Sequence, residues 1–193
     1  MGQVAECRTE LDLDPEQLIF AWNNALPLDI SIRSLERVDT SDFHPHKNVD
    51  YKIYYYHVFL ERPLPFVQRY GYFFHYPITT TTLHKALQIF VGTHDFRSFC
   101  TGDEMGKDTI RTIDMASVEY FKRFNFYRIA IKGQSFLRYM IRRIVGACLE
   151  VVSRPDLSIT ALEEALAKKD PQQILPNAPA KGLLLYKIVY KGN

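Results

Sequence analysis

The segment from residue 133 to 146, GQSFLRYMIRRIVG, restricts the possible folds of this chain more than any other part of the sequence. Apolar residues recur here at helical spacing, which predicts a helix with one buried face: Phe136, Met140, Ile141, Ile144, Cys148 and Val151. The segment also carries Arg138, Arg142 and Arg143, and their spacing places Arg138 and Arg142 on one side of that helix. Because arginine keeps its charge in a folded protein, an arginine held beside a core needs an acidic or phosphate partner. The alternative is a half-exposed helix whose arginines are solvated.

Charge is distributed unevenly along the chain. The net charge is only +2, but residues 1–50 hold four Lys/Arg against ten Asp/Glu, a local balance of −6. Residues 105–154 hold ten Lys/Arg against four Asp/Glu, a local balance of +6, with aromatic residues among them. Concentrated positive charge with interleaved aromatics is typical of a surface that binds a polyanion. Ordinary surface patchiness is the alternative.

Composition excludes several classes of protein. A chain of 193 residues with 47% hydrophobic and 24% charged residues fits one sizeable globular domain or two small ones. It has no apolar run long enough to span a bilayer and no basic-then-apolar signal pattern at its N-terminus. Its three cysteines, Cys7, Cys100 and Cys148, are too few and too scattered for a disulfide framework or a zinc site. We therefore expect a protein of the reducing cytoplasm.

Hydrophobic periodicity predicts an α+β protein with one mixed or antiparallel sheet and helices on one face. We expect helices over residues 15–25, 81–91 (capped by Thr81 or Thr82 and stopped by Gly92), 133–151 and 159–168. We expect strands over residues 2–9, 30–38, 51–60, 109–121, 125–132 and 182–190.

Conventional catalytic and metal-binding motifs are absent from the sequence. His44 and His46 have a spacing that suits a metal, but Pro45 between them and the lack of a third ligand nearby favour loop histidines. Asp95 follows a helix stop and is expected to cap a turn, and Cys100 is expected to serve packing.

Several segments together resemble one known family. They are residues 2–4, 26–32, 42–44, the strand KIYYY at 52–56, GTHDFRSF at 92–99, RTI at 111–113, the arginine-bearing segment, and AKGLLL at 180–185. In this order they resemble the tRNA pseudouridine synthase A (TruA) family across essentially the whole chain. Each segment alone is a weak signal, and it is their shared order that makes the match specific.

The resemblance implies a fold and an activity. The fold is the two-lobed α+β pseudouridine synthase fold, with residues 1–42 as the remnant of a truncated N-terminal lobe and residues 43–193 as the C-terminal lobe. Members of the family isomerise uridine to pseudouridine in the anticodon stem-loop of tRNA, at positions 38, 39 and 40, on a nucleotide flipped out of its stack. They use no metal or organic cofactor, and the bacterial members are homodimers. The implied partners are therefore tRNA and a second copy of the chain.

The resemblance also assigns roles to residues. Tyr54 matches the tyrosine that stacks on the flipped base, although a cross-strand aromatic pair is the alternative for this position. Arg142 matches the arginine that pairs with the catalytic aspartate, and it would hold that carboxylate ionised and aimed. Lys52, Arg138 and Arg143 are implied phosphate contacts, which give affinity and register.

The sequence departs from the family pattern in two places. The family's nucleophile lies in an Arg-Thr-Asp-x-Gly-Val-His loop just before the segment matched by residues 2–4, so we expect the sequence given to begin after that loop and to be inactive alone. Asp114 in RTID at 111–114 imitates the motif but matches a different family segment, and His46 stands where family members carry arginine.

Three hypotheses follow from these departures. The chain is a synthase whose given sequence is shortened, or a non-catalytic tRNA-binding paralogue, or a protein-interaction domain that reuses the fold. The retained Tyr54 and Arg142 favour the first.

Overall fold

The computed structural model describes residues 2–10, 13–38, 43–101, 108–170, 172–173 and 175–191. The chain divides into two compact units, one formed by Val4–Asn48 and the other by Val49–Asn193 together with Met1–Gln3. The boundary between the units lies close to the predicted division at residues 42 and 43. The assignment of these parts as lobes of a synthase stays a prediction.

A mixed sheet is the framework of the larger unit. Its five strands within the described residues are β1 (Val49–Phe59), β2 (Tyr72–Phe73), β5 (Met115–Phe121), β6 (Phe126–Gly133) and β7 (Leu183–Tyr190). The order is β2-β1-β6-β5, and β7 also pairs with β1; only the β1–β2 pairing is parallel. β1 is therefore the central strand, and its β-branched and aromatic residues suit a strand that is paired along both edges.

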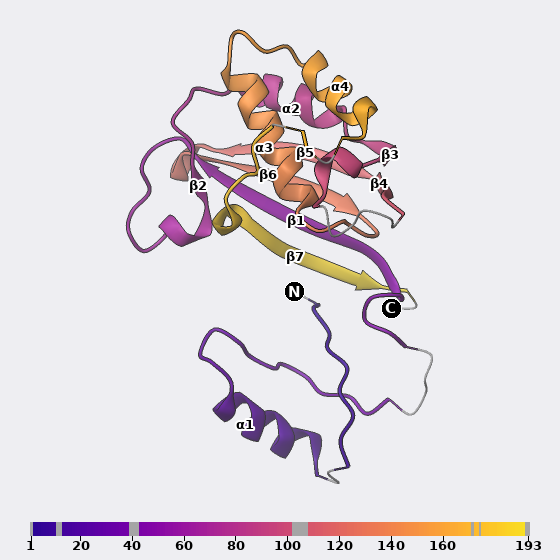
Figure 1. The fold of residues 1–193 in the computed structure, drawn as a ribbon. Coiled ribbons are helices and arrows are strands. Elements are labelled where there is room, and N and C mark those ends of the chain that lie inside the picture. The colour runs from indigo at the N-terminus through magenta and orange to yellow at the C-terminus, as the bar shows by residue number, and fades with distance from the viewer. Residues whose placement is uncertain are drawn as a thin grey trace. The chain divides into compact units, whose positions relative to one another are not determined.

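Three helices cover one face of this sheet, as Figure 1 shows: α2 (Thr80–Gln88), α3 (Met140–Ser153) and α4 (Thr160–Lys168). Most positions of α3 are buried, which confirms its predicted apolar face. The core lies between α3 and the sheet, where Ile144 of α3 and Tyr56 and Ile129 of the sheet are fully buried. The predicted α+β class, with a mixed sheet and helices on one face, is confirmed.

The arginine-bearing segment differs from its prediction in one respect that matters for the site. Helix α3 begins at Met140, so Arg138 precedes the helix, and the prediction that Arg138 and Arg142 share one helix face is wrong. β6 ends at Gly133 in the sheet layer, and the chain uses residues 134–139 to reach the helix layer. Tyr139 adopts a left-handed conformation with φ 65°, which cannot continue a right-handed helix.

Two other boundaries in the larger unit were predicted wrongly. The strand expected over residues 109–121 is two strands, because β4 (Ile110–Ile113) pairs with β3 (Gly92–Asp95) in a separate small sheet while β5 joins the main sheet. Helix α2 is capped by Thr79, whose hydroxyl accepts a hydrogen bond from the Thr82 amide, and neither Thr81 nor Thr82 is the cap.

The smaller unit contains the predicted helix α1 (Pro15–Ala25), capped by the Asp14 carboxylate, which accepts from the Glu16 amide at 3.0 Å. The strands predicted over residues 2–9 and 30–38 are wrong, since neither stretch is a strand in the described residues. The Asn23 side chain bonds both the amide and the carbonyl of Ile32, at 2.8 and 3.0 Å. Those are the backbone groups that a neighbouring strand would need.

Candidate active site

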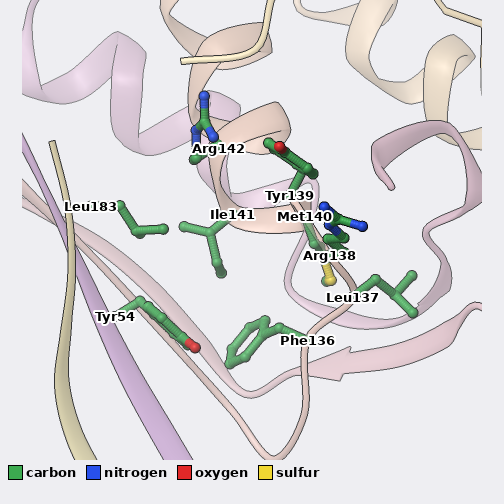
Figure 2. A pocket seen from close by; sticks show the side chains of 9 residues that line it. All are labelled: Tyr54, Phe136, Leu137, Arg138, Tyr139, Met140, Ile141, Arg142 and Leu183. Atoms are coloured by element: carbon green, nitrogen blue, oxygen red, sulfur yellow. The ribbon is translucent and has the colours of Figure 1, made fainter. Parts of the chain in front are cut away.

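A pocket of about 520 Å³ opens where the start of α3 faces β1 and β7 (Figure 2). Its size lies within the range of sites that hold small molecules or single nucleotides. Residues from three places in the sequence line it: Tyr54 of β1, the continuous stretch Phe136, Leu137, Arg138, Tyr139, Met140, Ile141 and Arg142 across the start of α3, and Leu183 of β7. It thus joins the predicted site residues Tyr54, Arg138 and Arg142 in one cavity.

Tyr54 forms the sheet side of the pocket. Its neighbours across the two strand pairings are Ile131 of β6 and Leu185 of β7, so the alternative of a cross-strand aromatic pair is not formed. The Tyr54 ring instead meets Phe136 edge to face, with 5.3 Å between ring centroids and an interplanar angle of 86°. Burial raises the pKa of the Tyr54 phenol, which keeps the side chain neutral at physiological pH.

Arg142 forms the helix side of the pocket and is anchored at one atom. Its Nε donates to the carbonyl of Ala178 at 2.7 Å, and the Ala178 amide donates back to the Arg142 carbonyl at 3.0 Å. The guanidinium also lies over the Tyr139 ring, 4.9 Å from its centroid. Among the residues the structure describes, no carboxylate forms an ion pair with Arg142 and none lines the pocket.

Gly146 brings the anchoring carbonyl to Arg142. It lies one turn further along α3, and a Cβ at this position would overlap the carbonyl oxygen of Pro176 and approach the Ala178 amide to 2.7 Å. The absence of a side chain therefore lets residues 176–178 lie directly against α3. The predicted helix contained this glycine, but only the tertiary structure reveals what it contacts.

The remaining predicted site residues are placed differently. Arg138 is exposed, lines the pocket and lies 5.6 Å from the Tyr139 ring centroid. Lys52 precedes Tyr54 by two residues on β1 without lining the pocket, and its partial burial lowers its pKa. Arg143 does not line the pocket either; its Nη1 donates at 3.4 Å to the carbonyl of Ser98 in the short 3₁₀ helix Arg97–Phe99.

Sequence reasoning missed two important lining residues. Phe136 was assigned to the buried face of the predicted helix, whereas it lies in the turn before α3 and packs against Tyr54. Tyr139 was not singled out at all, because a positive φ at a tyrosine leaves no signal in the sequence.

The other candidates lie outside the pocket. The His46 amide donates to His44 Nδ1 at 3.1 Å, so that nitrogen is a hydrogen-bond acceptor within the loop. The described part of the chain holds no group of three His, Cys, Asp or Glu side chains arranged to bind a metal. Asp114 is exposed between β4 and β5 and does not line the pocket.

Two structural predictions at the end of β3 are confirmed. The Asp95 carboxylate accepts from the Arg97 amide at 3.2 Å and so caps a turn. Cys100 is buried in the core. No helix in the described ranges is long and apolar enough to cross a membrane.

Comparison with known proteins shows the family to which the chain belongs. A family model described as tRNA pseudouridine synthase matches residues 86–191, more than half of the chain. The tRNA pseudouridine synthase A of Thermodesulfovibrio yellowstonii is 34% identical over 200 residues, covering 98% of this chain and 78% of the relative. That of Geobacillus sp. WCH70 is 38% identical, and tRNA pseudouridine synthase A 1 of Bacillus cereus ATCC 14579 is 36% identical; each match covers 98% of this chain and 75% of the relative. The chain therefore belongs to the tRNA pseudouridine synthase A family, as the resemblance predicted.

Proposed function

We propose that this protein isomerises uridine to pseudouridine in tRNA. The observation that carries the proposal is the meeting of Tyr54 and Arg142, from distant parts of the sequence, on opposite sides of one pocket (Figure 2). A base needs a flat ring to lie on and a reacting carboxylate needs a fixed cation, and this pocket offers both.

The sheet side and the helix side of the pocket have different roles in the proposed reaction. The target nucleotide leaves its stack and enters the pocket, where the uracil lies against Tyr54, whose ring is held in place by Phe136. An aspartate held by Arg142 attacks C1′ of the ribose, and the oxygen–C1′ bond forms as the bond between C1′ and N1 of uracil breaks, with its electron pair on N1. The uracil turns, and C5 displaces the aspartate from C1′, which returns the aspartate as a carboxylate. C5 then loses its proton and N1 gains one. Atoms and electrons balance within the substrate, because the reaction is an isomerisation.

No carboxylate of the described residues lines the pocket, so the nucleophile has to be sought elsewhere. We propose that it is an aspartate in a loop of the Arg-Thr-Asp-x-Gly-Val-His type, outside the 193 residues given. The support is that Arg142 has its Nε occupied by Ala178, while no hydrogen bond in the described part of the chain engages its two terminal nitrogens. Those two nitrogens form the fork that binds a carboxylate in a bidentate manner.

The finer features of the proposal rest on the family resemblance and on charge. The substrate region is the anticodon stem-loop, at positions 38, 39 and 40, and the active form is a cytoplasmic homodimer. Exposed Arg138 at the pocket and the local charge of +6 over residues 105–154 favour phosphate contacts around the flipped nucleotide. Lys52 and Arg143 are proposed as further phosphate contacts. The proposed homodimer is tested by sedimentation of the purified protein.

The proposal is tested by an assay for pseudouridine in tRNA with two proteins. One is the chain of 193 residues, and the other is the chain extended by the codons upstream in frame. We expect pseudouridine in the anticodon arm with the extended protein and none with the shorter one. Activity of the shorter chain would overturn the placement of the nucleophile, and inactivity of both would overturn the proposed reaction.

A second candidate function is tRNA binding without catalysis. It is favoured by the lack of a carboxylate at Arg142 among the described residues. This function predicts that tRNA affinity falls steeply with salt and that no pseudouridine forms with either protein. A protein-interaction domain would differ from both candidates, since it would not bind tRNA even at low salt.

A further inference from the structure

We propose that Tyr139 is a positioning residue for Arg142. The strained backbone of Tyr139 holds the Tyr139 ring against the Arg142 guanidinium. The mechanistic part of this proposal rests on the proposed synthase activity. Its structural part concerns the orientation of one side chain and can be tested without any reaction.

The backbone of Tyr139 is unusual for its residue type. Residues Leu137–Met140 form a turn closed by the Met140 amide, which donates to the Leu137 carbonyl at 3.1 Å. Tyr139 occupies the third position of this turn with φ 65° and ψ −3°. A positive φ at that position is the mark of a type II turn, which favours glycine or asparagine. A tyrosine here carries conformational strain that either of those residues would relieve.

Neither helix capping nor core packing explains why residue 139 is a tyrosine. Tyr139 stands at the cap position of α3, yet its side chain makes no capping hydrogen bond. Its ring is only half-buried and is not part of the core. A strained residue that neither caps a helix nor fills a core points to a role in the adjoining site.

The Tyr139 ring contacts two arginines of the site. The Arg142 guanidinium lies 4.9 Å from the ring centroid and the Arg138 guanidinium 5.6 Å from it, both within cation–π range. Figure 2 shows the Tyr139 ring between these two arginines. With Nε bonded to Ala178 and its central carbon over the Tyr139 ring, the Arg142 guanidinium is restrained at two points. A guanidinium whose orientation is already fixed loses less entropy when a carboxylate binds it.

The positioning role predicts a particular pattern among variants. In the extended protein, Tyr139→Gly relieves the strain and removes the ring, so we expect a thermal midpoint equal to or above that of the extended parent and a kcat about tenfold lower, with KM for tRNA changed less than about twofold. Tyr139→Phe keeps the ring and should retain most of the parent kcat. A purely structural role would instead lower the thermal midpoint of the glycine variant.

Lys169→Gly is the matched control. Lys169 also has a positive φ, of 52°, at the end of α4, and it does not line the pocket. Its replacement should relieve similar strain and leave kcat unchanged. Full parent activity of Tyr139→Gly, or an equal loss of kcat in Lys169→Gly, would overturn the proposal.

A spectroscopic measurement separates this proposal from the proposed function. The Arg142 Nε–H gives a side-chain resonance in proton–nitrogen NMR, which can be assigned by its loss in Arg142→Lys. We expect slow solvent exchange of this resonance in the parent and in Tyr139→Phe, and faster exchange in Tyr139→Gly. Unchanged exchange in the glycine variant refutes the positioning role, whereas absence of pseudouridine with both the extended protein and the chain of 193 residues refutes the proposed function and leaves the NMR result standing.

Discussion

The two walls of the pocket are built in different ways. Tyr54 belongs to a strand whose pairing with β6 is unbroken, so its direction follows from the pleat of the sheet, although the pairing with β7 shifts register between Ile53 and Tyr54. Arg142 belongs to the first turn of a helix whose start depends on a strained tyrosine, on a carbonyl from residues 176–178 and on a glycine that lets that carbonyl approach. One wall is set by a repeating pattern and the other by several single contacts. The helix wall should therefore be the more sensitive to single substitutions.

The largest expected effect is that of Arg142→Lys. Lysine keeps the charge but loses the planar fork and the Nε that bonds Ala178, so kcat should fall on the order of a thousandfold. Single-turnover pseudouridine formation by the active form of the protein measures it. Arg143→Lys, at the neighbouring position outside the pocket, should lose much less activity. Comparable losses at both positions would contradict the assignment of the carboxylate partner to Arg142.

Gly146→Ala tests how the helix wall is held. Helix propensity alone predicts a stabilisation of about 1 kcal/mol. The overlap with Pro176 predicts instead a loss of about 1–3 kcal/mol in the free energy of unfolding, together with reduced activity as Ala178 moves away from Arg142. Urea unfolding decides between these opposite signs. A stabilised, fully active alanine variant would show that the close approach is not needed.

Tyr54→Ala tests the sheet wall. Loss of base stacking should cost about 1–3 kcal/mol of transition-state stabilisation, seen as a kcat/KM lower by about 5- to 150-fold, whereas Tyr54→Phe keeps the ring and most of the activity. Because burial raises the Tyr54 pKa above its ordinary value, the phenol stays protonated through the neutral and mildly alkaline range. The pH–rate profiles of the parent and Tyr54→Phe should therefore coincide up to about pH 10. An alkaline limb present only in the parent would contradict this.

The smallest effect is expected for Arg138→Gln. Arg138 is exposed, so the loss of one phosphate contact should weaken tRNA binding only a few-fold and reduce the salt dependence of binding by about one unit of slope. Lys168→Gln, on the exposed surface of α4, is the control and should leave the slope unchanged. Filter binding across a salt series measures both. An unchanged slope in Arg138→Gln would remove Arg138 from the phosphate contacts.

Prediction from the sequence succeeded where a pattern repeats and failed where a single contact decides. The central strand, the helix α1 and the buried face of α3 were predicted because burial periodicity is written along the chain. The strands expected over residues 2–9 and 30–38 have suitable residues, but neither stretch is a strand in the described structure. Strand propensity is a weak guide by itself, because a strand is stabilised by the neighbour that it pairs with.

The candidate site shows the same division. Tyr54, Arg138 and Arg142 were identified from the sequence through the family resemblance, and the structure places all three around one pocket. The same resemblance grouped Lys52 and Arg143 with them, although neither lines the pocket. Residues that are near in sequence to a site diverge in direction along a strand or helix, and only coordinates reveal which of them face the cavity.

In the arginine-bearing segment, the contributions of the sequence and of the tertiary structure can be separated. The sequence by itself determined that an apolar helix carries cations that need a partner, because periodicity and the permanent charge of arginine are properties of the chain. The tertiary structure decided where that helix begins, which arginine enters the pocket, and what holds it there. Those outcomes depend on the positive φ of Tyr139 and on the approach of residues 176–178 to Gly146. The approach to Gly146 is a contact between segments distant in sequence, and the turn position of Tyr139 is one where local preference favours glycine or asparagine, so local preference predicts neither.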